Sequence, residues 1–208
     1  MTLTRQAISD AATASGWRYV LGTLSRSVPS TSLAGALEIA AAAAAACGAD
    51  ADEHLRVDPR ADRVELVLRS ATSLDLALAE RISAAIPVGE SHGRAVQLLE
   101  IGIDALDIPA VLPFWRAVLA YVNDGDDGLV DPVGQGPAIW FQQMTEPRPQ
   151  RNRIHFDVSV AHDEAPPRIR AALDAGGVLV SDEHAPAWWV LADAEGNEAC
   201  VSTWQGRD

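Results

Sequence analysis

Lysine is missing from this 208-residue sequence, and all 16 of its basic residues are arginines. Schiff-base chemistry on a lysine is therefore excluded. The sequence has 29 acidic residues, which give a formal net charge of −13. A surface this acidic repels phosphate groups, so we expect neither nucleic acid nor an anionic membrane as a partner.

Cysteine is scarce as well. Cys47 and Cys200 are the only two, and they lie far apart without the spacing of a metal-binding motif, so we expect free thiols in a reducing compartment. The longest apolar run, residues 39–47, is too short and too rich in alanine to span a bilayer. No charged leader followed by an apolar core opens the sequence. These features predict a cytoplasmic protein.

Several catalytic motifs are also missing. No serine stands in a nucleophile elbow, which removes support for nucleophilic hydrolysis. The Gly-Gln-Gly motif at residues 134–136 is too short for a dinucleotide fingerprint and fits a hairpin loop. The acidic stretch 124–128 lacks the downstream glutamate of a calcium loop, so it is also interpreted as a turn.

Turn-forming residues from Pro87 to Arg94 divide the sequence into two parts. We predict one domain over residues 1–88 and another over residues 95–208, each large enough for its own core. In the first domain the pattern predicts a helix over 4–15, a strand over 17–24, a helix over 33–47, a strand over 63–69 and a helix over 74–86. The second helix is mostly alanine, so another backbone can approach it closely.

The second domain is predicted to be an internal repeat of one strand, one helix and three strands. The first copy is expected at 96–103, 108–120, 121–123, 129–131 and 138–144. The second copy is expected at 153–160, 164–175, 178–180, 187–192 and 198–204. Two βαβββ halves with mainly antiparallel sheets place the chain in the α+β class.

One strand of the second copy has a polar side whose groups could bind a metal or transfer a proton. Residues 154–160 alternate as a half-buried strand does, with the polar side formed by His155, Asp157 and Ser159. Glu100 and Glu198 lie on strands with the same alternation, and Ile101 and Ile103 are expected to face a helix. Imidazole and carboxylate groups hold metals or move protons, so these residues predict a site inside a sheet.

The repeat resembles the vicinal oxygen chelate superfamily, and most of all the glyoxalase-like branch common in actinobacteria. Three segments carry the resemblance, which spans residues 96–208: residues 107–115, 152–157 and 193–200. The resemblance implies a cupped sheet with the helices outside and a ligand cavity inside. The function that it implies is that of a small-molecule-binding protein.

The resemblance also places metal ligands at inward positions of the first and last strands of each half. Those positions are Glu100, His155 and Cys200, with Glu198 two residues before Cys200 on the same face. The last strand of the first half departs from the pattern, because it offers Trp140 or Phe141, and neither side chain binds a metal. One alternative is therefore a divalent metal held by Glu100, His155 and Glu198, for a lyase, isomerase or dioxygenase.

The other alternative, which we favour, is a cavity without a full metal site and without an assigned cofactor. Aromatic walls with a few polar groups are typical of small-molecule pockets. The strand pattern offers Trp188 or Trp189 and Gln142 or Gln143 as such groups. The predicted ligand-binding residues are Trp140, Gln142, His155, Asp157 and Trp204.

The first domain resembles the pterin-4a-carbinolamine dehydratases over residues 3–86, as a dehydratase-like α/β module. Gly16 and Trp17, the long helix, and residues 52–55 leading into 63–69 carry this resemblance. The two adjacent histidines of that family fall on Glu53 and His54, and a further histidine falls on Ala71.

The acidic residue of that family is matched by Asp75. The resemblance implies a lyase that dehydrates 4a-hydroxytetrahydrobiopterin, with Glu53, His54 and Asp75 as the acid–base set. The alternative, which we favour, is a retained scaffold whose site has decayed and which mediates dimerisation or docks against its neighbour. By analogy with both families, we expect a homodimer.

Overall fold

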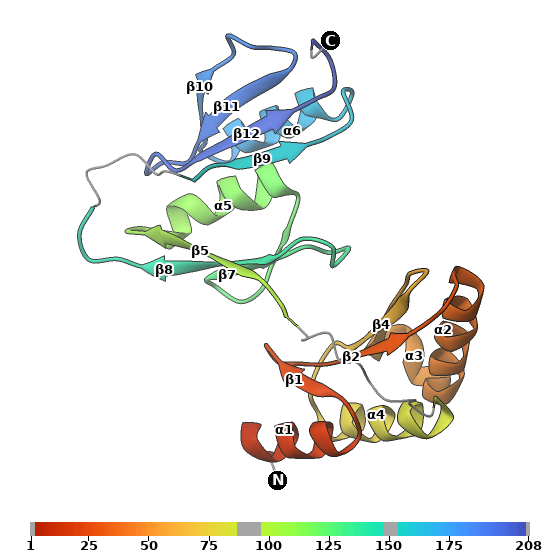
Figure 1. Cartoon of the computed structure of the whole chain (residues 1–208). Helices are drawn as coiled ribbons and strands as arrows, with labels where there is room; N and C mark the ends of the chain where they lie inside the picture. The colour runs from red at the N-terminus through yellow and green to blue at the C-terminus, as the bar shows by residue number, and fades with distance from the viewer. Residues whose placement is uncertain (1–2, 87–96, 148–153, 207–208) are drawn as a thin grey trace. The chain divides into compact units, whose positions relative to one another are not determined.

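The computed structural model describes residues 3–86, 97–147 and 154–206, and the boundary predicted at Pro87 to Arg94 lies outside these residues (Figure 1). The chain separates into two compact units, Met1–Leu98 (unit 1) and Leu99–Asp208 (unit 2). Each unit has its own cluster of buried apolar side chains. Helices and sheets are combined in both units, which confirms the predicted α+β class.

Unit 1 contains a four-stranded antiparallel sheet with the order β1-β2-β4-β3. Its core lies between the helices and the sheet face that carries Leu24, Val64 and Leu66. The strands are β1 (Arg18–Val20), β2 (Thr23–Pro29), β3 (Leu55–Pro59) and β4 (Arg63–Leu68). The helices are α1 (Arg5–Ala14), α2 (Leu33–Cys47), η1 (Gly48–Asp50), α3 (Ala51–His54) and α4 (Ser73–Ala85).

The single strand predicted over residues 17–24 is wrong, because the chain forms a hairpin of β1 and β2 there. Leu21 and Gly22 both have positive φ angles, 46° and 76°, the combination that a tight two-residue hairpin turn needs. β2 was missed because Arg26 breaks its apolar pattern. The buried Arg26 guanidinium donates to Ser83 Oγ (2.8 Å) and to the Ile86 carbonyl (3.0 Å).

β3 was also missed by the sequence pattern. It is an edge strand with two charged residues, and it ends in Pro59, which is tolerated at the edge of a sheet. The strand pairs with β4 along its whole length, from Leu55 opposite Leu68 to Pro59 opposite Val64. This pairing holds the end of α3 beside the start of α4.

The helical stretch Leu33–His54 continues beyond the alanine-rich run. By length and composition alone, this 22-residue stretch is long and apolar enough to cross a membrane, since an 18-residue window of it has a mean hydropathy of 1.4. The core helix of a soluble protein passes the same test of length and composition. Ala36, Ala43 and Cys47 of α2 pack into the core of unit 1.

Unit 2 contains two sheets of the same topology, as the predicted repeat requires. Their orders are β5-β8-β7-β6 and β10-β11-β12-β9, so in each half the first strand pairs in parallel with the last. The first half comprises β5 (Glu100–Ala105), α5 (Ile108–Leu119), β6 (Val122–Asn123), β7 (Gly128–Val130) and β8 (Ala138–Gln143). The second comprises β9 (Phe156–Ser159), α6 (Ala165–Asp174), β10 (Val178–Ser181), β11 (Trp188–Ala192) and β12 (Glu198–Ser202).

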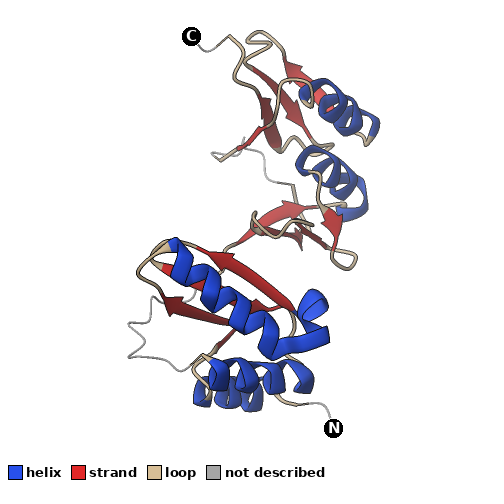
Figure 2. Cartoon of the chain, turned by 90° about the vertical axis from the view of Figure 1, so that its right-hand side faces the viewer, coloured by secondary structure: helices blue, strands red, loops and turns tan. Residues whose placement is uncertain are grey.

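Helices α5 and α6 pack against each other, and they lie side by side in Figure 2. One apolar cluster includes residues of both helices and both sheets. The Trp115 ring of α5 meets the Phe156 ring of β9 edge to face, with centroids 5.1 Å apart. The two halves therefore share one core.

Polar contacts also join the halves. The Trp115 indole N–H donates to the buried Asp193 carboxylate over 2.9 Å. The Glu195 carboxylate accepts the backbone N–H groups of Leu106 (2.9 Å) and Asp107 (2.7 Å), just before α5 begins. Because Asp193 and Glu195 belong to the turn between β11 and β12, this turn is fixed against the start of α5.

Candidate functional site

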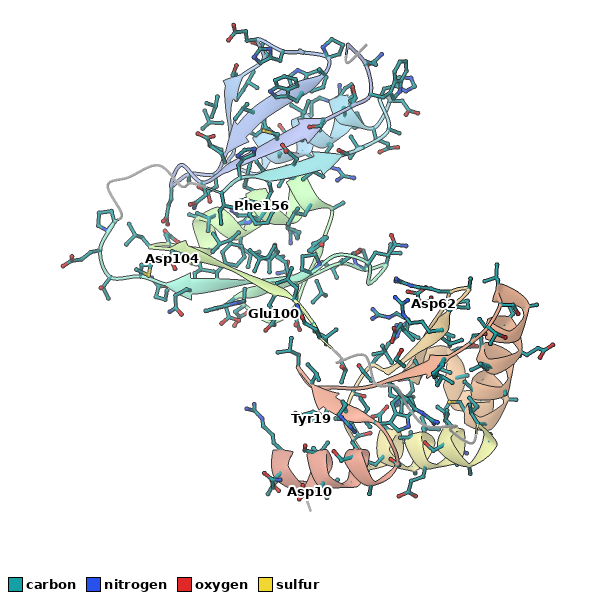
Figure 3. All side chains as sticks on the ribbon, viewed as in Figure 1. Asp10, Tyr19, Asp62, Glu100, Asp104 and Phe156 are labelled. Atoms are coloured by element: carbon teal, nitrogen blue, oxygen red, sulfur yellow. The ribbon has the colours of Figure 1, made fainter. Side chains whose placement is uncertain are left out.

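Burial along the strands of the first half separates a core face from an open face. Ile103, Ile139 and Phe141 are buried in the core, so Trp140 and not Phe141 belongs to the open face. Figure 3 labels Glu100 and Asp104, both of which lie on β5. By strand alternation the open face carries Glu100, Gly102 and Asp104 of β5 with Ala138, Trp140 and Gln142 of β8.

Trp140 covers the middle of this open face. It pairs with Gly102 in the register, and a Cβ atom added to that glycine would lie 3.0 Å from the Trp140 ring. The indole therefore lies over the glycine, and 42% of Trp140 stays exposed. The exposed Gln142 pairs with Asp104, whereas the Gln143 amide donates to the Leu106 carbonyl (2.7 Å). Gln142 is thus the glutamine of the open face.

The second half repeats this division. Phe156, Ala199 and Val201 belong to the core cluster or pack against it. By alternation, the open face carries His155, Asp157 and Ser159 of the β9 segment with Glu198, Cys200 and Ser202 of β12. The parallel register of β9 and β12 places Asp157 opposite Cys200.

His155, Asp157 and Cys200 form a compact group on this face. One ligand atom from each residue lies within 4.8 Å of the other two, and this is the only such group of three or more His, Cys, Asp or Glu in the described parts of the chain. His155 Nε2 and Asp157 Oδ2 are 3.7 Å apart. Imidazole, carboxylate and thiolate together suit a borderline ion such as Zn²⁺.

The predicted metal set is therefore only partly assembled. His155 is in the group, but Glu100 and Glu198 are not. Glu100 lies on β5 in the other sheet. The β9–β12 register puts Cys200 rather than Glu198 opposite Asp157. Asp157 and Cys200 were both noted in the sequence, but their proximity depends on this register, which the sequence pattern does not specify.

A cavity of about 670 Å³ lies next to these faces, between β5, the start of β9 and the β11–β12 turn. Figure 3 labels two of its residues, Asp104 and Phe156. Its apolar lining includes Trp115 and Phe156. The full lining is Ile101, Gly102, Ile103, Asp104, Ala105, Leu106, Trp115, Met144, Glu146, Pro147, Ile154, Phe156, Ala194, Glu195, Gly196, Asn197 and Glu198.

The predicted ligand-binding residues do not line this cavity. Its described lining contains none of the five, namely Trp140, Gln142, His155, Asp157 and Trp204. The first four lie on the open faces or at their edge, and the exposed Trp204 meets His162 edge to face at 5.6 Å. Trp188 stacks on His184 at 4.3 Å, while Trp189 packs against the core.

Asp193 builds the turn that closes one side of the cavity. It is 2% exposed and accepts the backbone N–H groups of Glu195 and Asn197, each over 2.9 Å. The Asn197 side chain and the Trp115 indole donate to its other oxygen. Residues 193–200 carried part of the family resemblance in the sequence, but no role in the site was predicted for Asp193. The available signal was an aspartate followed by Gly196 in a short turn.

Unit 1 contains a second site, formed by His54 at the end of α3 and Asp75 in the first turn of α4. The His54 Nδ1 and Asp75 Oδ1 atoms are 2.8 Å apart. Asp75 is fully buried, and its Oδ2 atom accepts from Ser70 Oγ (2.9 Å), the Thr72 backbone N–H (3.0 Å) and the Thr72 hydroxyl. Thr72 and Asp75 together form the capping box of α4.

These contacts shift both pKa values. Burial raises the pKa of Asp75, but the hydrogen bonds from Thr72, His54 and Ser70 outweigh burial and leave that pKa below its ordinary value. The hydrogen bond to Asp75 raises the pKa of His54, and the charge of Glu53 adds to this effect. The pair therefore favours an imidazolium beside a carboxylate.

The other predicted residues of this site have different positions. Glu53 is exposed on the short helix α3. Ala71 is half-buried and packs against the core of unit 1, and its methyl side chain has no group that could act as an acid or a base. The structure thus brings together His54 and Asp75, and it adds Ser70 and Thr72, which the sequence comparison did not identify.

Residues 100–202 match the model of a family described as a glyoxalase-like domain. Among solved structures, a glyoxalase/bleomycin resistance protein/dioxygenase family enzyme from Burkholderia phytofirmans is 16% identical, with 50% of this chain and 95% of that chain covered and a TM-score of 0.36. A fosfomycin resistance protein from Mesorhizobium loti is 10% identical, with coverages of 51% and 90% and a TM-score of 0.41.

A third structure, a transcriptional coactivator/pterin dehydratase from Brucella melitensis, is 25% identical. It covers 41% of this chain and 98% of its own, with a TM-score of 0.35. A search of curated proteins found no match to the chain. Since these TM-scores are low, the identification of a glyoxalase-like domain in unit 2 rests on the family match alone.

Proposed function

Because residues 100–202 form a glyoxalase-like domain, we propose that this protein binds a small molecule in the cavity of unit 2. The observation that carries the proposal is a cavity of about 670 Å³ that is lined by both apolar and polar residues. This volume falls in the range of roughly 300–1,000 Å³ that small-molecule sites occupy. The cavity is bounded by elements of both halves.

Hydrogen bonds of the β11–β12 turn fix the walls of this cavity in the absence of a ligand. The Asp193 carboxylate holds its own turn and the Trp115 indole, and Glu195 holds the start of α5. A site whose walls are fixed in advance loses less conformational entropy on binding. The fixed walls therefore support the interpretation of the cavity as a binding site and not as a packing defect between the two halves.

A binding experiment with a blocking variant tests the proposal. Ala194 is an exposed lining residue, so Ala194→Trp adds volume at the cavity without disturbing the core. We expect ligands from a metabolite panel to bind the wild type in calorimetry and to bind Ala194→Trp at least about tenfold more weakly, a loss of roughly 1.4 kcal/mol. Ala161→Trp, at an exposed position outside the described lining, is the control. Equal binding to all three proteins would remove the proposal.

A metal-dependent lyase, isomerase or dioxygenase is the alternative at the same domain. His155, Asp157 and Cys200 are the residues that would hold the ion, in place of the set with Glu100 and Glu198. A bound divalent ion would supply Lewis-acid chemistry. Metal analysis of the purified protein separates the two alternatives. Stoichiometric metal that is lost in Cys200→Ser, but kept in the control variant Cys47→Ser, would favour the metal-dependent enzyme.

For unit 1 we propose dehydration of a 4a-hydroxytetrahydropterin, because His54 and Asp75 are hydrogen-bonded over 2.8 Å. Dehydration needs an acid for the departing hydroxide and a base for the ring N–H proton. His54, with its raised pKa, is suited to the acid role, and the exposed Glu53 to the base role. Asp75 orients the imidazole.

The dehydration rate of the His54→Ala variant tests this second activity. Loss of a positioned acid lowers such rates by about a hundredfold or more, so we expect a fall of that size. His184→Ala, which removes a histidine from unit 2, should leave the rate unchanged. An unaltered rate in His54→Ala would leave unit 1 as a scaffold.

A further inference from the structure

The two oxygens of the Asp75 carboxylate in unit 1 have different partners. Oδ1 lies 2.8 Å from His54 Nδ1. Oδ2 accepts from Ser70 Oγ (2.9 Å), from the Thr72 backbone N–H (3.0 Å) and from the Thr72 hydroxyl. Three donors at one oxygen hold the plane of the carboxylate in place, because rotation would break these hydrogen bonds together. Oδ1 therefore stays directed at the imidazole.

Burial explains why Asp75 needs these donors. Its side chain is fully buried, whereas the His54 side chain is 17% exposed. Burial raises the pKa of a carboxyl group, but the hydrogen bonds that this carboxylate accepts leave the pKa of Asp75 below its ordinary value. An ionised carboxylate can only accept hydrogen bonds. His54 Nδ1 is therefore the donor of the pair.

The position of this proton decides which nitrogen of His54 can act on a bound molecule. A neutral imidazole has one nitrogen that donates a hydrogen bond and one that accepts. With its N–H on Nδ1, the ring gains and loses a proton at Nε2. The partly exposed imidazole thus keeps one proton at its contact with Asp75 and exchanges the other at Nε2.

Other charged groups around His54 act on its pKa. The hydrogen bond of the pair has the largest effect and raises this pKa, burial opposes it, and the charges of Glu53 and Asp50 raise it further. Asp50 is 3.4 Å from Arg81 of α4, so part of its charge is balanced. The exposed Arg69 donates its backbone N–H to the His54 carbonyl over 2.9 Å. These groups change how readily the ring is charged, but the contact at Nδ1 decides which nitrogen keeps the proton.

We propose that Ser70 and Thr72 are positioning residues, which act through Asp75. They lock His54 as the Nδ1–H tautomer, so that Nε2 transfers the proton. This role rests on the dehydration proposed for unit 1. In that reaction the C–O bond of the substrate breaks, and the leaving hydroxide takes the Nε2 proton to become water. The C=N bond forms as Glu53 takes the ring N–H proton, and exchange with solvent restores both groups.

Nitrogen NMR of the isotope-labelled imidazole tests the tautomer in the full-length protein without a substrate. A nitrogen with a proton and a nitrogen without one have clearly different chemical shifts. Above the raised pKa of His54, we expect the neutral ring to carry its proton on Nδ1. A neutral ring with its proton on Nε2 would overturn the inference.

The Ser70→Ala variant tests the positioning role. It removes one donor to Asp75 but keeps the capping box of α4. The Nδ1 proton of His54 should then exchange with water about two- to tenfold faster, the range that corresponds to the loss of one hydrogen bond. Ser73→Ala, at an exposed position in the first turn of α4, is the matched control and should leave the exchange unchanged. Equal exchange in the wild type and Ser70→Ala would contradict the role of Ser70.

A pair of variants tests Thr72. Thr72→Ser keeps the hydroxyl and the helix cap, so its Nδ1 proton should exchange as in the wild type. Thr72→Ala removes both the donor to Asp75 and the cap, so exchange should be at least as fast as in Ser70→Ala. Exchange in Thr72→Ala as slow as in Thr72→Ser would contradict the role of Thr72. If Thr72→Ala does not fold without its cap, Ser70→Ala decides the inference.

Dehydration kinetics separate this inference from the function on which it rests. Ser70→Ala should lower kcat about two- to tenfold and leave KM unchanged, because a less firmly oriented imidazole affects the proton transfer and not the binding of the substrate. If the wild type does not dehydrate the substrate, the function proposed for unit 1 fails, and NMR still decides the tautomer. If the wild type is active and Ser70→Ala has the same kcat, or changes only KM, the positioning role is wrong although the function stands.

Discussion

His54 and Asp75 form an ion pair whose two members depend on pH in opposite directions. Because the pKa of Asp75 is lowered by folding, its contribution to stability is present above its unfolded value, about 4, and is lost as the pH falls through the folded value. Because the pKa of His54 is raised, its contribution is present below about 6.5 and is lost as the pH rises through the folded value. The pair therefore stabilises unit 1 most between these limits.

This gives a prediction for the His54→Ala variant. The difference in free energy of unfolding between the wild type and His54→Ala should be larger at about pH 5.5 than at about pH 8.5, since the imidazolium is lost at the higher pH. Urea unfolding at the two pH values measures it. His184→Ala, which removes a histidine from unit 2, is the control for the loss of a histidine outside the His54–Asp75 pair. A difference that is the same at both pH values would contradict the assigned pair.

Single residues also show what the sequence could and could not predict about the sites. The dehydratase resemblance identified His54 and Asp75, because an acidic residue at the start of the last helix is part of its pattern. Strand alternation predicted that Cys200 faces the same side as Glu198. The contact of Cys200 with Asp157 needed the parallel register between two strands about forty residues apart in sequence.

At the scale of elements, the packing of α5 on α6 depends on a glycine after α6. A Cβ atom added to Gly177 would lie 2.4 Å from Cδ2 of Phe114 and 2.8 Å from the Ala172 carbonyl oxygen. Phe114 belongs to α5 and is fully buried. Gly177 therefore allows the end of α6 to approach the other half of unit 2.

Gly177→Ala should destabilise unit 2 by about 1–3 kcal/mol, the usual cost of excess volume in a packed core. Denaturant unfolding of the full chain measures this. In the double variant with Phe114→Leu, part of the cost should disappear, because the smaller side chain leaves room for the new methyl group. Strictly additive effects would mean that Gly177 and Phe114 are not coupled.

The elements of unit 2 were predicted better than those of unit 1. Each predicted helix and strand of the repeat has a counterpart in the structure, because apolar alternation and the glycines after α6 mark them clearly. In unit 1 the pattern missed β2, where Arg26 occupies a core position, and β3, an edge strand that ends in Pro59. Charged residues inside strands therefore caused both errors.

At the scale of the whole molecule, the α+β class followed from the order of predicted elements alone. The cavity of unit 2 could not be predicted in this way, because it depends on how the two halves pack. That packing uses the bond from Trp115 to Asp193, 78 residues away in the sequence, and the contacts of Glu195 with Leu106 and Asp107. Strand alternation pointed instead to Trp140 and the open faces.

The two units carry separate proposals, since each has its own core and its own candidate site. The net charge of −13 acts on both, and it favours cationic over anionic small molecules at any exposed site. Its effect is long-ranged and screened by salt, whereas contacts inside the cavity act at short range. A ligand preference that survives at high salt therefore belongs to the cavity.

The most direct test of the account is an NMR titration of isoleucine methyl signals with the ligand that binds most tightly in the metabolite panel. Ile101, Ile103 and Ile154 line the cavity, whereas Ile8 and Ile82 lie in the core of unit 1. The account predicts saturable shifts of the first three signals and none for the other two. Shifts that spare the cavity isoleucines, or that occur only in unit 1, would contradict it.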